Sequence, residues 1–94
     1  MNGRKVIWLP SVKSKLIQFR SKYFTPEETL NIISEVILET EDILKNPILS
    51  STYTEEIGKY KGISRIVIRR FRVYFERIDD KMIIIIAILF PGEQ

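Results

Sequence analysis

Five arginines lie within one short stretch of the chain, GISRIVIRRFRVYFERIDDK, which spans residues 62–81. They alternate with Ile, Val, Phe and Tyr, which favour β-strands. Successive side chains of a strand point to opposite faces, so this pattern predicts two strands with one apolar and one basic face. Guanidinium groups bind phosphate and carboxylate oxygens through paired hydrogen bonds. The stretch therefore predicts a small sheet whose basic face binds a polyanion or an acidic peptide.

The alternation assigns individual side chains to the two faces. In the first strand, one face is expected to carry Arg65, Val67 and Arg69. In the second strand, the side chains expected to point away from Phe71, Val73 and Phe75 are Arg72, Tyr74 and Glu76. Arg69 and Arg70 flank the tight turn between the strands and serve either solubility or the docking of a partner. Arg77, beside the Asp79-Asp80 turn, is expected to be a solvated charge.

The loop before these strands adds further candidates. Lys59 and Lys61 lie just before Gly62 and are either exposed loop charges or contacts to phosphate. Tyr53 and Tyr60 either stack on nucleobases or cover the edge of the core.

The composition excludes several kinds of chemistry. The chain has 94 residues, no histidine and no cysteine, which rules out an imidazole base, a thiolate nucleophile and a disulfide. It has neither of the glycine-rich loops that bind nucleotide phosphates, and Asp79-Asp80 in a hairpin is a weak pattern for a metal site. We therefore expect neither a metal nor a cofactor.

The charge is unevenly distributed along what we expect to be a single domain spanning residues 1–94. The net charge is only +3, but acidic residues dominate residues 25–42 and basic residues dominate residues 59–81. This asymmetry indicates one basic surface. The longest apolar run, MIIIIAILF, is far shorter than the roughly 20 residues of a membrane helix, and the first residues lack a stretch long enough for a signal peptide. We expect a cytoplasmic protein.

Hydrophobic periodicity predicts an α+β fold that begins with a strand and two helices. A short strand at residues 6–9 is stopped by Pro10, which suits a position at a sheet edge. Ser11 is expected to cap a helix whose apolar stripe is formed by Val12, Leu16, Phe19 and Tyr23.

The second helix has the stronger start signal. Thr25, Pro26 and Glu28 form a capping box. The expected apolar stripe of this helix consists of Leu30, Ile33, Val36, Ile37 and Leu44, and Asn46-Pro47 is expected to end it. A turn of two or three residues between the helices predicts an antiparallel hairpin. An irregular loop at residues 48–62 should then lead into a three-stranded meander, with a turn at Asp79-Asp80-Lys81 and a central last strand.

The ordered set of these features resembles the RelE/ParE superfamily of bacterial toxins. The resemblance covers residues 6–89 and rests on the following features: the order β-α-α-β-β-β, the opening VIWLPSVKSKL, the helix ending Leu44-Lys45-Asn46-Pro47, the Gly62 to Arg65 entry into the sheet, and the hairpin FRVYFERIDDK before an Ile-rich last strand. The expected fold is a helix hairpin packed on a small, mainly antiparallel sheet.

The resemblance implies the toxin of a type II toxin–antitoxin module, which a cognate antitoxin neutralises. One branch of the superfamily cuts messenger RNA on the ribosome, and the other poisons DNA gyrase. In the nucleases, basic residues on the sheet hold the scissile phosphate, and Arg65 and Arg72 stand at two such strand positions. Arg69, Lys59 and Lys61 are the further candidates for target or phosphate binding. Neither a membrane nor a small-molecule cofactor is expected among the partners.

The end of the chain departs from the pattern of the nucleases. Those toxins usually carry His, Arg, Lys or Tyr at the end of the last strand or just after it, whereas this chain has the sequence FPGEQ there. Cleavage of RNA needs a group that takes a proton and one that gives a proton, and arginines do both poorly. The candidate proton carriers are Tyr74, Glu76 and Glu93.

Three functions therefore stay open, in a definite order. The sequence favours a toxin that acts by binding, as in the gyrase-directed branch, over a ribosome-dependent endoribonuclease. The third alternative is a degenerate, non-toxic binding module that keeps the fold.

Overall fold

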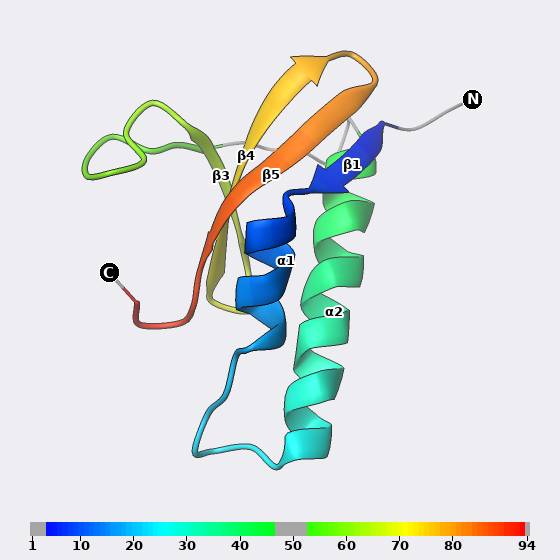
Figure 1. Ribbon diagram of the computed structural model, residues 1–94. Helices are drawn as coiled ribbons and strands as arrows, with labels where there is room; N and C mark the ends of the chain where they lie inside the picture. Colours follow the sequence, from blue (N-terminus) through cyan, green and yellow to red (C-terminus); the bar gives the residue numbers. More distant parts are fainter. Residues whose placement is uncertain (1–3, 47–52, 94) are drawn as a thin grey trace.

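The computed structural model describes residues 4–46 and 53–93, and its helices and strands form an α+β fold (Figure 1). The elements are β1 (Lys5–Trp8), α1 (Pro10–Ile17), α2 (Pro26–Lys45), β2 (Tyr53–Thr54), β3 (Ser64–Ile68), β4 (Phe71–Asp79) and β5 (Met82–Leu89). The five strands make one mixed sheet in the order β1-β5-β4-β3-β2, in which β1 is parallel to β5 and the other pairs are antiparallel. The sheet is therefore mainly antiparallel, as expected.

The opening strand lies at the sheet edge, as the sequence predicted. Because β1 pairs only with residues 82–85 of β5, the second half of β5 has no strand on that side. The helix that follows begins at Pro10 and is preceded by Leu9, whose side chain makes no cap. The prediction that Ser11 caps this helix was wrong, because proline is favoured in the first helical turn and starts the helix one residue earlier.

Two antiparallel helices cover the sheet, but the connection between them is longer than predicted (Figure 1). Helix α1 ends at Ile17, and residues 18–25 connect it to α2. Val12, Leu16 and Phe19 are buried as expected, whereas the Tyr23 side chain is 78% exposed because it lies in the connection and not on the helix.

The second helix begins at the predicted capping box. Thr25 Oγ1 accepts a hydrogen bond from the Glu28 backbone N–H, and the Glu28 carboxylate accepts one from the Thr25 N–H. Ile33, Val36 and Leu44 are buried and Ile37 packs against the core, but Leu30 is 59% exposed. The buried stripe of α2 begins at Thr29, and Leu30 lies beside it on the helix surface. Asn46 caps the C-terminus of α2, while Pro47 of the predicted stop signal lies outside the described residues.

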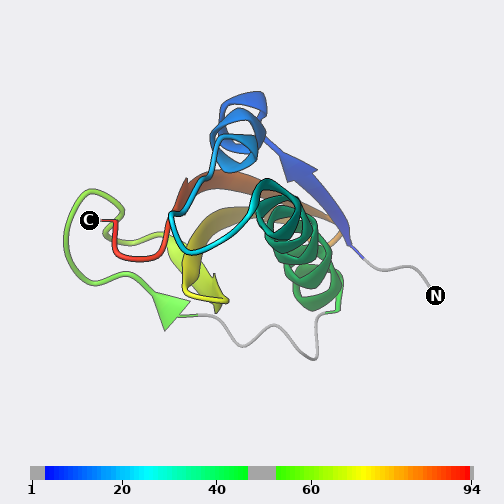
Figure 2. The ribbon, with the colours of Figure 1, turned by 90° about the horizontal axis from the view of Figure 1, so that it is seen from below.

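The meander β3-β4-β5 confirms the predicted alternation. The side chains facing the helices and the main core are Ile66, Ile68, Phe71, Val73, Phe75, Ile83, Ile85 and Ile88. Arg65, Arg72 and Tyr74 belong to the opposite face. Among the described residues, the sequence did not predict β2, which lies inside the expected loop and pairs with β3. Residues 55–62 of that loop and residues 90–93 after β5 lie on the side of the sheet away from the N-terminus, as Figures 1 and 2 both show.

Candidate polyanion-binding cleft

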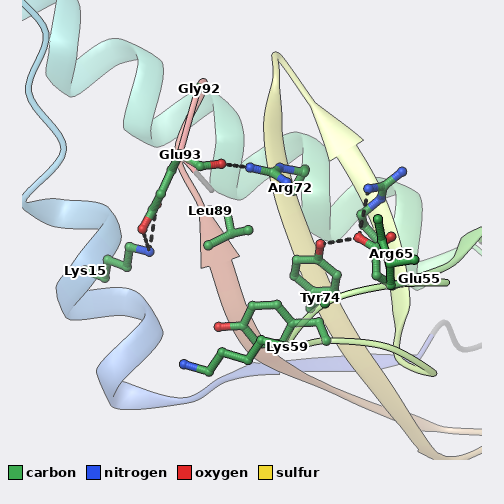
Figure 3. A pocket seen from close by; sticks show the side chains of 12 residues that line it. Lys15, Glu55, Lys59, Arg65, Arg72, Tyr74, Leu89, Gly92 and Glu93 are labelled. Atoms are coloured by element: carbon green, nitrogen blue, oxygen red, sulfur yellow. Dashed lines mark hydrogen bonds and ion pairs between the residues drawn. The ribbon is translucent and has the colours of Figure 1, made fainter.

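An open cleft of about 880 Å³ lies on the sheet face opposite the main core. Strands β3 and β4 supply Arg65, Arg72 and Tyr74, and the loop before β3 supplies one wall (Figure 3). The charged residues that line the cleft are Lys15, Lys59, Arg65, Arg72, Glu55 and Glu93. Four cations against two carboxylates leave an excess of two positive charges, so the cleft favours an anionic ligand.

The cleft contains most of the predicted site residues. Lining residues among the predictions are Lys59, Arg65, Arg72, Tyr74 and Glu93. Lys61, Arg69 and Glu76 do not line it. Arg69 leaves the basic face because the hairpin turn begins there, and Glu76 lies farther along β4, beyond the irregularity in its pairing with β5.

One wall of the cleft is a hydrogen-bonded group of three side chains, Glu55, Arg65 and Tyr74. The Tyr74 hydroxyl donates to Glu55 Oε2 over 2.6 Å, and Arg65 Nη1 donates to the same oxygen over 3.1 Å (Figure 3). The Arg65 guanidinium also stacks on the Tyr53 ring, 4.4 Å from its centre. These contacts fix the position of Arg65, which is therefore a structural residue as well as a candidate ligand group.

The tyrosines of this wall also pack on each other. Tyr60 stacks on Tyr74 with the ring centres 4.4 Å apart. Tyr74, Ala87 and Leu89 form a small second core on this face of the sheet, against which Tyr60 and Ile63 pack. Tyr60 thus covers the edge of a core, one of its two predicted roles, and its stacking holds the loop against the sheet.

The opposite wall is built from α1 and the C-terminal segment. Lys15 Nζ lies 2.9 Å from both carboxylate oxygens of Glu93 and donates to the Ile88 carbonyl over 2.7 Å. Arg72 donates to the backbone carbonyl of Glu93 (Figure 3). The Glu93 carboxylate also accepts a hydrogen bond from the Phe90 N–H. The segment after β5 therefore folds back over the two cations.

Three groups of the cleft, Glu55, Tyr74 and Glu93, have pKa values shifted away from pH 7. The hydrogen bond from Tyr74 lowers the pKa of Glu55, and the nearby Arg65 charge lowers it further. Burial and the bond to Glu55 raise the pKa of Tyr74. The hydrogen bond from Lys15 lowers the pKa of Glu93. None of these groups is poised to exchange a proton near pH 7.

The turn between β3 and β4 holds two arginines in a strained conformation. Arg69 and Arg70 have φ values of 51° and 71°, in the left-handed region that favours Asn and Gly. Arg69 pairs with Glu35 at 3.5 Å and with Glu39 at 2.8 Å, and these carboxylates raise its pKa. Arg69 therefore joins the hairpin to α2, and it faces away from the cleft.

The sequence did not single out Lys15 or Glu55 as site residues. Lys15 was visible only as a charge off the apolar stripe of its helix, and its position depends on α1 running along β5. Glu55 lies in the predicted loop, where no periodicity assigns a direction to a side chain. Its spacing of ten residues from Arg65 carries no local signal, since the β2–β3 pairing brings the two together.

Across residues 4–46 and 53–93, no cluster of three or more His, Cys, Asp or Glu side chains is arranged to hold a metal ion. No helix in the described part of the chain is both long enough and apolar enough to cross a bilayer. Comparisons with protein-family models, with curated proteins and with solved structures found no match.

Proposed function

We propose that this chain is the toxin of a type II toxin–antitoxin module with a RelE/ParE-like fold, and that it arrests growth by binding DNA gyrase without cutting RNA. The support from the fold is the order and direction of the elements, in which a parallel β1–β5 pair flanks an antiparallel meander under two helices. The two-residue strand β2 is an addition to the expected β-α-α-β-β-β order. The role places the protein in the cytoplasm, where gyrase acts.

The observation that carries the binding mode is the chemistry of the cleft. Four cations converge there, while the pKa values of Glu55 and Glu93 are lowered and that of Tyr74 is raised. A nuclease that lacks a group able to exchange protons near neutrality forgoes the roughly 10²–10⁴-fold that general acid–base catalysis supplies. A protein that binds an anionic target needs only the positive charge.

The second candidate function, a RelE-like ribosome-dependent endoribonuclease, has one observation in its favour. In the same cleft as Arg72, the Glu55 carboxylate accepts hydrogen bonds from both the Tyr74 phenol and the Arg65 guanidinium. Arginines stabilise the charge that develops on a phosphorane. The two modes share the cleft and differ in whether RNA is cut.

The toxin assignment is tested by controlled expression in a bacterial host. The wild-type chain should arrest growth, and a cognate antitoxin expressed with it should restore growth and elute with it as one complex. Arg72→Ala should relieve the arrest, because it removes a cation of the cleft that hydrogen-bonds a backbone carbonyl and no side chain among the described residues. Arg77→Ala is the matched control, since Arg77 is exposed on β4 and does not line the cleft.

Two outcomes would contradict the proposal. If the wild-type chain does not affect growth although it folds and accumulates, the degenerate binding module becomes the better account. If Arg72→Ala and Arg77→Ala are both as toxic as the wild type, the cleft is not the surface that engages the target.

A further inference from the structure

The C-terminal segment places a carboxylate at two cations of the cleft. Glu93 bridges two elements, because its side chain binds Lys15 on α1 and its backbone carbonyl binds Arg72 on β4. Both carboxylate oxygens lie 2.9 Å from the same ammonium group, a geometry that a phosphate with two free oxygens also fits. The chain thus contributes an anion of its own to a site built from cations.

Lys15 is held in this position by the fold and not by Glu93 alone. Strand β1 leaves β5 after residue 85, and Leu9 makes the last backbone bond to β5, donating to the Ile85 carbonyl over 3.2 Å. Helix α1 then follows the unpaired edge of β5, where Lys15 satisfies the Ile88 carbonyl. The Lys15 ammonium also lies 5.0 Å from the centre of the Phe90 ring. The cation therefore stays at the cleft when Glu93 is absent.

The bond between Lys15 and Glu93 is easily exchanged. The two side chains are 35% and 36% exposed, and an ion pair at this exposure contributes little to stability because water and salt screen it. The segment of residues 90–93 is held by a turn in which Glu93 N–H donates to the Phe90 carbonyl over 2.9 Å. A ligand that offers several negative charges can therefore compete with one carboxylate.

We propose that Lys15 and Arg72 form a binding site for a phosphodiester group of a nucleic acid, and that Glu93 is an internal anion that occupies this site until the nucleic acid displaces it. Displacement leaves four cations facing Glu55 alone, so the excess positive charge of the cleft rises from two to three. This change favours a polyanion over a single carboxylate of a peptide. The inference goes beyond the proposed function, because it names a nucleic acid as an occupant of the cleft. It is tested by binding in solution, whereas the proposed function is tested by growth arrest.

The test measures fluorescence anisotropy of a labelled single-stranded RNA of about 12 nucleotides, the same sequence as single-stranded DNA, and the duplex DNA. Glu93→Gln should tighten binding by about 2–5-fold relative to Asp80→Asn. Asp80→Asn is the matched control, since it changes the net charge equally in the β4–β5 turn, far from the C-terminus (Figure 1). The nucleic acid whose binding is tightened by Glu93→Gln identifies whether the site takes RNA, single-stranded DNA or duplex DNA.

Lys15 is tested in two further ways. Lys15→Ala should weaken binding and reduce the slope of log affinity against log salt by about one, whereas Lys81→Ala in the distant turn should leave the affinity nearly unchanged. In the Lys15→Ala background, Glu93→Gln should no longer tighten binding, because its effect depends on freeing Lys15. If a Glu93 variant folds poorly, the salt dependence of binding by Lys15→Ala still shows whether Lys15 contacts a phosphate.

Three results would overturn the proposal. One is equal affinity of Glu93→Gln and Asp80→Asn for every nucleic acid. Another is a gain from Glu93→Gln that persists without Lys15. The third is the absence of nucleic-acid binding by all variants. This third result includes the case in which an acidic peptide binds instead, because the site would then recognise a protein partner.

Discussion

Removing one hydroxyl group should separate a structural role of Tyr74 from a catalytic one. The Tyr74 side chain is 1% exposed, and its hydroxyl donates over 2.6 Å to a carboxylate that Arg65 also binds. Tyr74→Phe keeps the ring and its stacking on Tyr60, so the lost interaction is the hydrogen bond alone. We expect the variant to fold, to lose stability and to keep its toxicity.

The size of the loss follows from the burial and the charge of the bond. A hydrogen bond to a charged group contributes more than a neutral one, while Glu55 retains Arg65 as a partner, so we expect a net loss of about 1–1.5 kcal/mol. In a domain of this length, that change lowers Tm by roughly 4–12 °C. Differential scanning calorimetry measures the shift, and Tyr53→Phe is the control because Tyr53 is 43% exposed on the short edge strand.

The pH dependence gives a second measure of the same bond. The pKa of Glu55 in the folded protein is below its usual value of 4.5, mainly because of Tyr74. Its contribution to stability is therefore fully present above pH 4.5 and is lost as the pH falls through the lower folded value. In Tyr74→Phe the folded pKa of Glu55 should lie closer to 4.5, so the loss of stability in acid should be smaller and should be complete at a higher pH than in the wild type. An unchanged Tm with abolished toxicity would refute the reasoning and make Tyr74 a reactive group.

Three further substitutions test the packing and the walls of the cleft. Arg70→Gly should stabilise the protein by about 0.5–1 kcal/mol in urea unfolding, because relief of a left-handed φ of 71° exceeds the entropy cost of glycine, and a loss of stability would contradict the assigned turn. Thr40→Val should stabilise it by about 1 kcal/mol, because the Thr40 hydroxyl is fully buried and has no hydrogen-bond partner among the described residues, and a lower urea midpoint would reveal such a partner. Arg65→Ala should lower Tm clearly more than Arg72→Ala, since Arg65 holds Glu55 and stacks on Tyr53, and equal shifts would show that this wall is not rigid.

Local rules were sufficient for those parts of the fold whose signals lie close together in the sequence. The capping box at Thr25 and Glu28 fixes the start of α2, because both hydrogen bonds join residues three apart. The alternation around Arg65 and Arg72 assigns the two faces of the meander, because the strand period is two. These rules placed two cations of the cleft correctly.

The rest depends on contacts between distant residues, which no local pattern records. Glu55 reaches the cleft through the β2–β3 pairing, and Lys15 reaches it because α1 follows the free edge of β5. In the sequence, Arg69 continues the alternation of the strand, but in the structure the turn directs its side chain away from the cleft and toward α2. Tyr23 has the sequence spacing of the apolar stripe, but it lies beyond the end of the helix at Ile17.

The central claim is that the cleft binds its target without cutting RNA. The most direct measurement maps RNA 5′ ends after brief induction of the chain, in parallel with a supercoiling assay on purified gyrase and the purified protein. The account predicts inhibited supercoiling and no new ends in phase with codons, because Glu55, Tyr74 and Glu93 are all held away from proton exchange near neutral pH. Strong cuts at one position within the codon, together with unaffected gyrase, would contradict it and make Arg65 and Arg72 catalytic residues of a nuclease.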